Sequence, residues 1–163
     1  MRILKYETEK EQLKAVREDA FNIKYINNPS EKVQLEAIKE YCTAMAYITN
    51  PSEKVQLEAV KKTPYTIEFI HNPSEKVQLA AVKRDCYSIR YIHNPTKKVQ
   101  LEVIEKDPTM IQYINNPSKA VIKYLLDNYI SDIEIVQLLS AKIGREWYDK
   151  LSDEDKLRLE LED

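Results

Sequence analysis

Two cysteines and two histidines are the residues of this 163-residue chain whose side chains are best suited to catalysis or metal binding. Cys86 and His93 could form a nucleophile and its base, but they fall seven residues apart on one expected short helix, too far for the hydrogen bond that such a pair needs. His71 and His93 have no cysteine or pair of carboxylates near them at the spacing of metal ligands. The single glycine, Gly144, argues against a glycine-rich phosphate loop. We therefore expect no enzymatic activity, no metal and no cofactor.

The cysteines also bear on the cellular compartment. Cys42 and Cys86 hold the same position two units apart in an internal repeat, which corresponds to roughly 20 Å when neighbouring helices pack at about 10 Å. A disulfide needs Cα atoms within about 7 Å, so we expect free thiols in a reducing compartment. The net charge is −2, and the chain has neither a membrane-spanning apolar run nor a signal peptide pattern. We expect a cytoplasmic protein with no membrane partner.

The internal repeat has a strict period of 22 residues. The dipeptide Asn-Pro recurs at residues 28, 50, 72, 94 and 116, and residues 28–38, 50–60 and 72–82 read NPSEKVQLEAI, NPSEKVQLEAV and NPSEKVQLAAV. A repeat of this length predicts supersecondary units that bury their apolar faces against one another. Five units are recognisable over residues 7–116, and a sixth then diverges.

Each unit contains two helix-start patterns. In the first, Asn50 can cap a helix over about residues 51–62, Pro51 suits its first position, and Glu53 can complete a capping box. In the second, Thr63-Pro64 begins a short helix over about residues 64–70 that could be partly 3₁₀. The alternation of Tyr65, Ile67 and Phe69 leaves a strand as the alternative, which would give an α/β horseshoe. The proline starts favour the helix.

The first helix of each unit has a wide apolar arc, as a helix between two neighbours requires. A glutamine lies inside this arc in every unit, at positions 12, 34, 56, 78 and 100. Because a buried amide needs partners, we expect these glutamines to form a ladder that bonds loop carbonyls or the next unit; a polar binding stripe is the alternative. In the second helix, the aromatic column of Tyr25, Tyr47, Phe69, Tyr91 and Tyr113 is expected to stack in the core.

The outer strip of the second helix differs from copy to copy. Positions 65, 68 and 71 and their equivalents face outward at a spacing of three residues, and a constant scaffold with a varied exposed strip is typical of recognition by solenoids. Exposed aromatic residues and arginine commonly dominate interfaces. The predicted partner-binding residues are Phe21, Lys24, Tyr65, Glu68, His71, Tyr87, Arg90, His93 and Gln112.

The chain changes character after the last Asn-Pro. Residues 117–163 hold seven basic and eleven acidic residues. Ser131 or Asp132 can begin a helix that ends at Gly144, and Ser152 can begin an acidic final helix. Trp147 and Tyr148 are expected to cover the last repeat. We thus predict an all-α fold of about five to six two-helix repeats over residues 1–122, followed by a helical cap over residues 123–163.

The units resemble the short NPSE-VQLAAVK repeats of bacterial and bacteriophage proteins over about residues 7–122, and they are more distantly similar to leucine-rich-variant and HEAT-like α-solenoids. The resemblance implies a right-handed α-solenoid with a binding role and transfers no catalytic residue. By analogy with small phage proteins that block host factors, it suggests a phage-encoded inhibitor of a host or antiviral-defence complex, as anti-CRISPR proteins are.

Two alternatives stay open at the level of the sequence. A nucleic-acid or nucleotide binder could use two neighbouring basic columns on the first helices, although glutamates run beside them. The columns are Arg17, Lys39, Lys61 and Lys83, and Lys62, Arg84 and Lys106. A self-assembling structural repeat is the other alternative, and the sequence leaves the oligomeric state open. A protein partner is the interpretation we carry forward.

Overall fold

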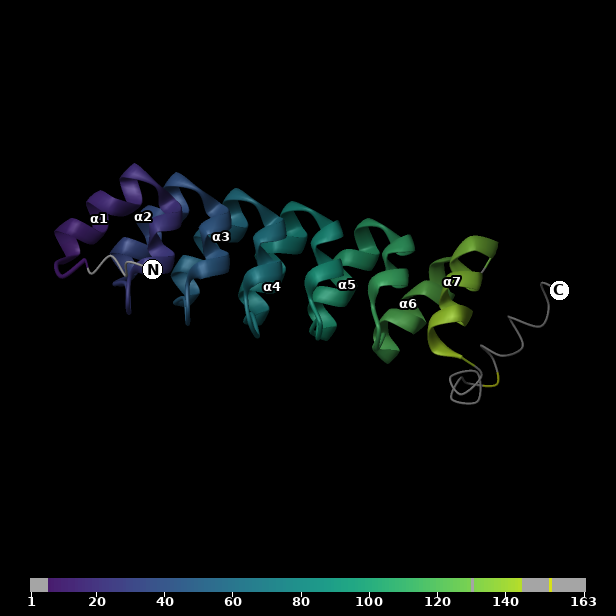
Figure 1. Cartoon of the computed structure of the whole chain (residues 1–163). Helices are drawn as coiled ribbons and strands as arrows, with labels where there is room; N and C mark the ends of the chain where they lie inside the picture. The colour runs from purple at the N-terminus through teal and green to yellow at the C-terminus, as the bar shows by residue number, and fades with distance from the viewer. Residues whose placement is uncertain (1–5, 130, 145–152, 154–163) are drawn as a thin grey trace. The chain divides into compact units, whose positions relative to one another are not determined.

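A computed structural model of the chain describes residues 6–129, 131–144 and 153, and its described part is entirely helical (Figure 1). No strand occurs among these residues, so the α/β horseshoe alternative is wrong. The chain divides into two compact units, the first Met1–Tyr91 and the second Ile92–Asp163. From here on, each 22-residue copy is called a repeat, and 'unit' refers to these two parts of the chain. No helix in the described part is long and apolar enough to cross a membrane.

The first unit contains four repeats, each made of one α-helix and one 3₁₀ helix. The α-helices pack on one another in chain order, the 3₁₀ helices do the same, and each of the first three 3₁₀ helices contacts the α-helix of its own repeat and that of the next. The result is a two-layer helical repeat. The elements are α1 (Glu9–Glu18), η1 (Ala20–Tyr25), α2 (Glu31–Glu40), η2 (Cys42–Tyr47), α3 (Glu53–Lys62), η3 (Pro64–Phe69), α4 (Glu75–Arg84) and η4 (Cys86–Tyr91), where η denotes a 3₁₀ helix.

The helices of the α layer begin two residues later than the sequence pattern predicts. Ser52, and not Asn50, is the N-cap of α3, and its hydroxyl accepts a hydrogen bond from the Val55 N–H. Glu53 is consequently the first helical residue and completes no capping box there. Asn50 instead has a φ of +53°, the left-handed conformation that asparagine tolerates better than most residues. Asn-Pro therefore forms the turn that leads into the helix.

Each 3₁₀ helix of the first unit follows directly because the preceding α-helix ends in an extended residue, and where that residue is aspartate its side chain also caps the 3₁₀ helix. Asp19 ends α1, and its carboxylate accepts a hydrogen bond from the Phe21 N–H at 2.9 Å. Asp85 does the same for Tyr87, also at 2.9 Å. With three residues per 3₁₀ turn, side chains at i and i+3 align. In η1 this places Ile23 and the following Ile26 on one buried edge.

The core lies between the two layers of each unit. From the α layer it receives valine and alanine side chains such as Val55, Ala59 and Val60, all of which are fully buried. From the 3₁₀ layer it receives isoleucine and methionine side chains such as Ile67 and Met45. Fully burying a valine or isoleucine contributes about 1.5–3 kcal/mol, so the repeated apolar columns supply most of the stability.

The second unit contains α5 (Lys97–Lys106), η5 (Pro108–Tyr113), α6 (Lys119–Tyr129) and α7 (Ile133–Ile143). Here α7 packs on η5 and on α6. As predicted, Asp132 caps the start of α7, where it accepts hydrogen bonds from two backbone N–H groups, and Gly144, at φ +61°, ends the helix. Trp147 and Tyr148, and the final helix expected from Ser152, fall outside the described residues apart from Asp153.

Candidate functional site

The repeated glutamine is a structural link, as predicted. The side-chain amides of Gln34, Gln56 and Gln78 donate to the carbonyl of the proline five residues earlier, at 2.9–3.0 Å. Gln100 does the same at 3.1 Å and also joins the following turn, because it donates to the Asn116 carbonyl and accepts from the Ser118 N–H. These bonds hold each Asn-Pro turn against its helix, so the amides are committed to the scaffold.

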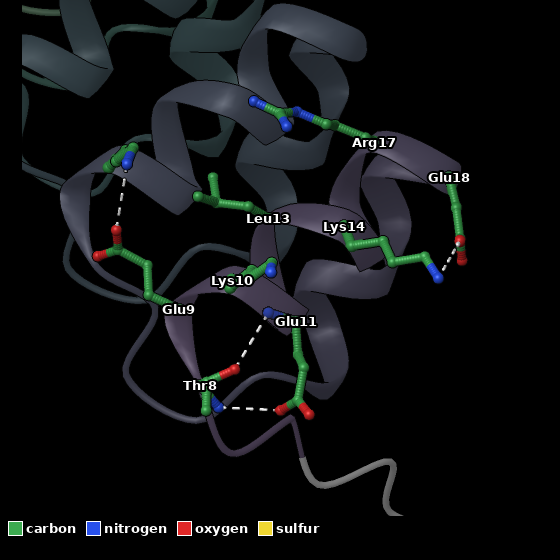
Figure 2. Close-up of a pocket in the computed structure, with 9 residues that line it drawn as sticks. Thr8, Glu9, Lys10, Glu11, Leu13, Lys14, Arg17 and Glu18 are labelled. Atoms are coloured by element: carbon green, nitrogen blue, oxygen red, sulfur yellow. Dashed lines mark hydrogen bonds and ion pairs between the residues drawn. The ribbon is translucent and has the colours of Figure 1, made fainter.

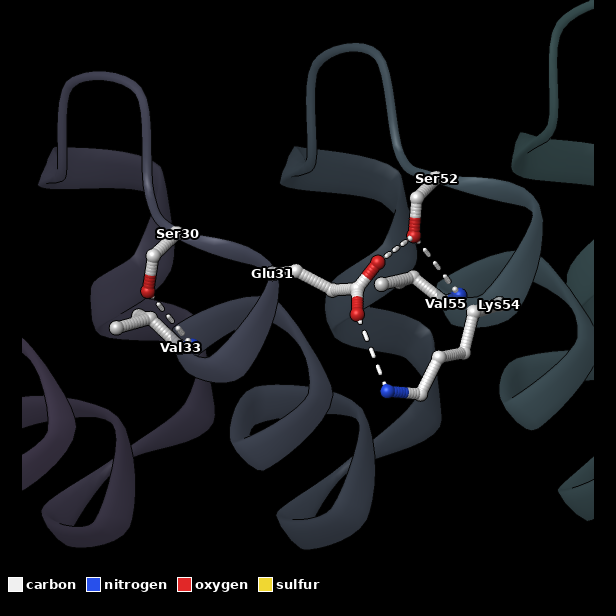
Figure 3. Close-up of polar contacts among 6 residues, drawn as sticks. All are labelled: Ser30, Glu31, Val33, Ser52, Lys54 and Val55. Carbon is white, nitrogen blue, oxygen red and sulfur yellow. Dashed lines mark hydrogen bonds and ion pairs between the residues drawn. The ribbon is translucent and has the colours of Figure 1, made fainter.

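A second ladder joins neighbouring repeats on the α layer (Figure 3). The Glu31 carboxylate accepts a hydrogen bond from the Ser52 hydroxyl at 2.6 Å and pairs with the Lys54 ammonium at 3.1 Å. The same glutamate-to-lysine pair recurs one repeat earlier and one repeat later, at 3.4 and 3.2 Å. This ladder could not be predicted from spacing along one helix, because its glutamate and lysine lie 23 residues apart in neighbouring repeats.

The ladder affects the ionisation of its carboxylates. The Ser52 hydroxyl, followed by the Lys54 ammonium, lowers the pKa of Glu31 below its ordinary value of 4.5. The Ser30 hydroxyl does the same for Glu9. These contacts favour the ionised carboxylate. The serines that cap α2 and α3 therefore also stabilise a glutamate charge of the preceding repeat.

The basic columns considered for nucleic-acid binding are engaged in similar contacts. Arg17 pairs with Glu36 of the next repeat at 2.6 Å, and Lys61 pairs with Glu58 at 2.9 Å. The Lys62 ammonium donates to the Ile38 carbonyl at 3.3 Å, at the end of the preceding α-helix. Cations paired in this way have less charge to offer to phosphates.

A shallow hollow lies over the outer side of α1 (Figure 2). Its lining is charged, and Glu11 stands in α1 where the later α-helices have a buried valine. Glu11 completes a capping box with Thr8, whose backbone N–H lowers the pKa of the Glu11 carboxyl. Figure 2 shows the Lys14 ammonium directed at Glu18. Glu11 and Lys14 are thus paired within α1 and its cap, as in a polar terminal repeat.

The predicted outer strip is at the surface. Eight of its nine residues are exposed, and the ninth, Phe21, is half-buried. Seven lie in the first unit, on η1, η3 and η4 or directly after η3, whereas His93 and Gln112 belong to the second unit. Phe21, Lys24 and Tyr65 are among the members that contact other side chains.

The aromatic column, by contrast, is not a core stack, and this prediction is wrong. Tyr47 and Phe69 are exposed by 48% and 41%, and Tyr25, Tyr91 and Tyr113 are half-buried. In each 3₁₀ helix the apolar edge toward the core is already filled by the isoleucine or methionine column. The aromatic ring at the last position therefore lies outside this edge, beside the predicted strip.

The rings of the first unit contact one another between repeats. The Phe21 ring packs edge-on against Tyr41 at 5.3 Å and against Tyr47 at 5.8 Å, and the Tyr65 ring packs edge-on against Tyr91 at 5.9 Å. We call the eight residues of this surface the aromatic face: Phe21, Tyr25, Tyr41, Tyr47, Tyr65, Phe69, Tyr87 and Tyr91. Five of them are exposed by 41–55%.

Polar groups hold two parts of the aromatic face in place. The Lys24 ammonium lies over the rings of Tyr25 and Tyr47, 4.8 and 5.9 Å from their centroids, and its contact with the Tyr25 hydroxyl raises the lysine pKa. The Tyr65 hydroxyl donates to the Asp85 carboxylate at 2.5 Å, which raises the tyrosine pKa. The rings are therefore positioned before any partner binds.

Sequence reasoning missed Tyr41, Tyr47 and Phe69 as surface residues. The available signal was the fixed isoleucine at the position after each aromatic residue, which already fills the core edge of a three-residue turn.

No protein-family model, no curated protein and no solved structure significantly matches the chain. The candidate site is therefore argued from the geometry of the described residues.

Proposed function

We propose that this chain is a non-catalytic helical-repeat protein that binds another protein through the aromatic face of its first unit. One observation carries the proposal: five large aromatic side chains are exposed on the 3₁₀ layer and its adjoining turn, while the valine and isoleucine columns behind them are buried. Clustered apolar exposure of this kind marks interaction sites. Tyrosine is also among the residues most enriched at the energetic centres of interfaces.

The polar residues beside these rings support a protein partner over a nucleic acid. Lys24, Glu68 and Arg90 occupy equivalent positions on η1, η3 and η4, so both signs of charge are present along the face. A surface that follows phosphates needs cations of one sign along its length. Mixed charge around aromatic rings is instead typical of the rim of a protein interface.

A more specific role follows from the repeat resemblance alone. Inhibition of a host or antiviral-defence complex by a phage-encoded protein would need a stable scaffold with a preformed contact face, and the aromatic face provides one. We propose this role as the first to be tested in cells. A phage-encoded inhibitor would restore phage growth in a bacterium that carries the targeted defence system, and a chain with an altered aromatic face would not.

The direct test compares two triple variants in affinity capture from a bacterial lysate treated with nuclease. Replacing Tyr65, Phe69 and Tyr87 by alanine removes three exposed rings and is expected to abolish capture of the partner. The matched control replaces Lys10, Lys39 and Glu40, exposed residues of the α layer outside the ladder, by alanine and is expected to leave capture intact. Equal capture by both variants would contradict the proposal, as would capture that disappears with nuclease.

A further inference from the structure

A repeated ring contact on the aromatic face is missing at one place. Phe21 on η1 contacts Tyr47 on η2, and Tyr65 on η3 contacts Tyr91 on η4. In both pairs, the first residue of one repeat's outer strip meets the ring 26 residues further along the chain. Within the first unit, the scaffold therefore places these two positions at ring-contact distance where both are aromatic.

Between η2 and η3 the same positions are Thr43 and Phe69. Threonine has no ring, and Phe69 makes no ring contact within the part of the chain that the structure describes. Its side chain is 41% exposed, which is unusual for a phenylalanine. Ala46 leaves little bulk beside it, where the equivalent residues of η1, η3 and η4 are Lys24, Glu68 and Arg90.

We propose that a partner supplies the missing ring: an aromatic side chain on an extended peptide segment packs edge-on against Phe69, above Thr43 and Ala46. This inference rests on the proposed function and identifies the chemistry of the partner. An aromatic pair contributes beyond the apolar area that it buries. At this position the pair would bury the exposed Phe69 ring while leaving the two existing ring pairs intact.

Charges on either side of the open position define the rest of the segment. The Lys24 ammonium lies on the η2 side, 5.9 Å from the centroid of the Tyr47 ring, and Glu68 directly precedes Phe69 on η3. Lys24 and Glu68 are two repeats apart, roughly 20 Å at a helix spacing of about 10 Å. Seven extended residues span a similar length, at about 3.3 Å per residue. A segment of about this length therefore has an acidic residue on the η2 side of its aromatic residue and a basic residue on the η3 side.

Fluorine NMR tests this inference directly because Phe21 and Phe69 are the two phenylalanines of the chain. Labelling with 4-fluorophenylalanine gives two signals, one from a ring already paired and one from the open position. The probe is the heptapeptide Asp-Ala-Ala-Trp-Ala-Ala-Arg with blocked ends. We expect it to shift the Phe69 signal and to leave the Phe21 signal in place, whereas the same peptide with leucine for tryptophan should have a much smaller effect.

Two variants identify the source of the effect. Thr43→Tyr supplies the ring from within the chain. It is expected to lower the affinity of the protein for the peptide about tenfold, since a buried aromatic contact dominates small interfaces. The fold should tolerate it, because Phe21 and Tyr65 occupy the same position in other repeats. The Glu68→Lys protein should bind a peptide with aspartate at both ends more tightly than it binds the Asp/Arg heptapeptide. A peptide with arginine at both ends should bind more weakly than the heptapeptide to the unaltered protein and also to the Glu68→Lys protein.

Several results would overturn the inference. These are equal shifts of both signals, no shift with any peptide, or the same affinity for the Thr43→Tyr protein. A Phe69 signal that moves with protein concentration alone would identify a second copy as the occupant instead. If the peptides fail while lysate capture still depends on Tyr65 and Tyr87, the protein-binding function stands and only the missing-ring mechanism is wrong.

Discussion

The α layer and the 3₁₀ layer of the first unit share one repeat length but differ in what their side chains do. In the α layer, glutamate, serine and lysine recur with the period and bind one another across repeats, as Glu31, Ser52 and Lys54 do. In the 3₁₀ layer, the core edge is constant, but the outer residues change and are exposed. The difference indicates that the α layer holds the repeats together and that the 3₁₀ layer is available for recognition.

Short helices explain this division physically. An α-helix of ten residues has room for a buried face and a charged face that reaches the next repeat. A six-residue 3₁₀ helix has two turns, so one edge faces the core and the others face solvent. Substitutions on these outer edges cost little stability, which leaves them free to vary.

The largest expected effect contrasts a buried residue of η3 with an exposed residue two positions further along. Ile67→Ala removes a fully buried side chain and should lower the free energy of unfolding by about 3 kcal/mol. Phe69→Ala removes a ring that is 41% exposed and should cost less than about 1 kcal/mol. Urea unfolding followed by circular dichroism measures both. Similar losses for the two variants would mean that the aromatic column is part of the core after all.

An intermediate effect is expected at the turn before each α-helix. Asn50 has a φ of +53°, so Asn50→Ala should destabilise the chain by about 1–2 kcal/mol. Asn50→Gly is the control, because glycine adopts this conformation without a steric penalty. If alanine and glycine gave the same thermal unfolding midpoint, asparagine would serve another purpose at this turn.

The smallest effect concerns the pH dependence of the ladder. The folded pKa of Glu31 is lowered from 4.5, so its contribution is present above that pH and is lost as the pH falls through the folded pKa. Stability should therefore decrease as the pH falls below about 4.5 and through the lowered pKa of Glu31. Glu31→Gln should make this decrease slightly smaller in urea titrations at several pH values. A steeper decrease in the variant would contradict the assignment.

Much of the fold could be predicted from the sequence because each position of the repeat can be compared with the equivalent position in the other copies. The period, the two-helix unit, the buried glutamines and the ends of α7 all follow from residue types at fixed spacing. The start of the α-helices that follow Asn-Pro is predicted two residues too early, because Asn-Pro and Ser-Glu both resemble capping patterns. Backbone conformation distinguishes them: Asn50 is left-handed and Ser52 is extended.

The candidate site could be predicted only in part. A varied strip that includes Tyr65 and Tyr87 was identified, since variation among copies indicates positions that the scaffold does not require. Phe69 and Tyr47 were assigned to the core because large aromatic side chains usually bury. Their exposure depends on how many edges of a 3₁₀ turn the neighbouring α-helices cover, which is a property of the packed layers.

The sequence by itself thus determined the repeat, its helices and the columns that bury, because local spacing and side-chain chemistry are sufficient for those. Tertiary structure alone decided which side chains meet between repeats. Contacts such as Glu31 with Lys54 and Phe21 with Tyr47 join residues more than 20 positions apart, and their distances depend on how each repeat packs on the next. The same packing places Thr43 and Phe69 at the position where a ring contact is missing.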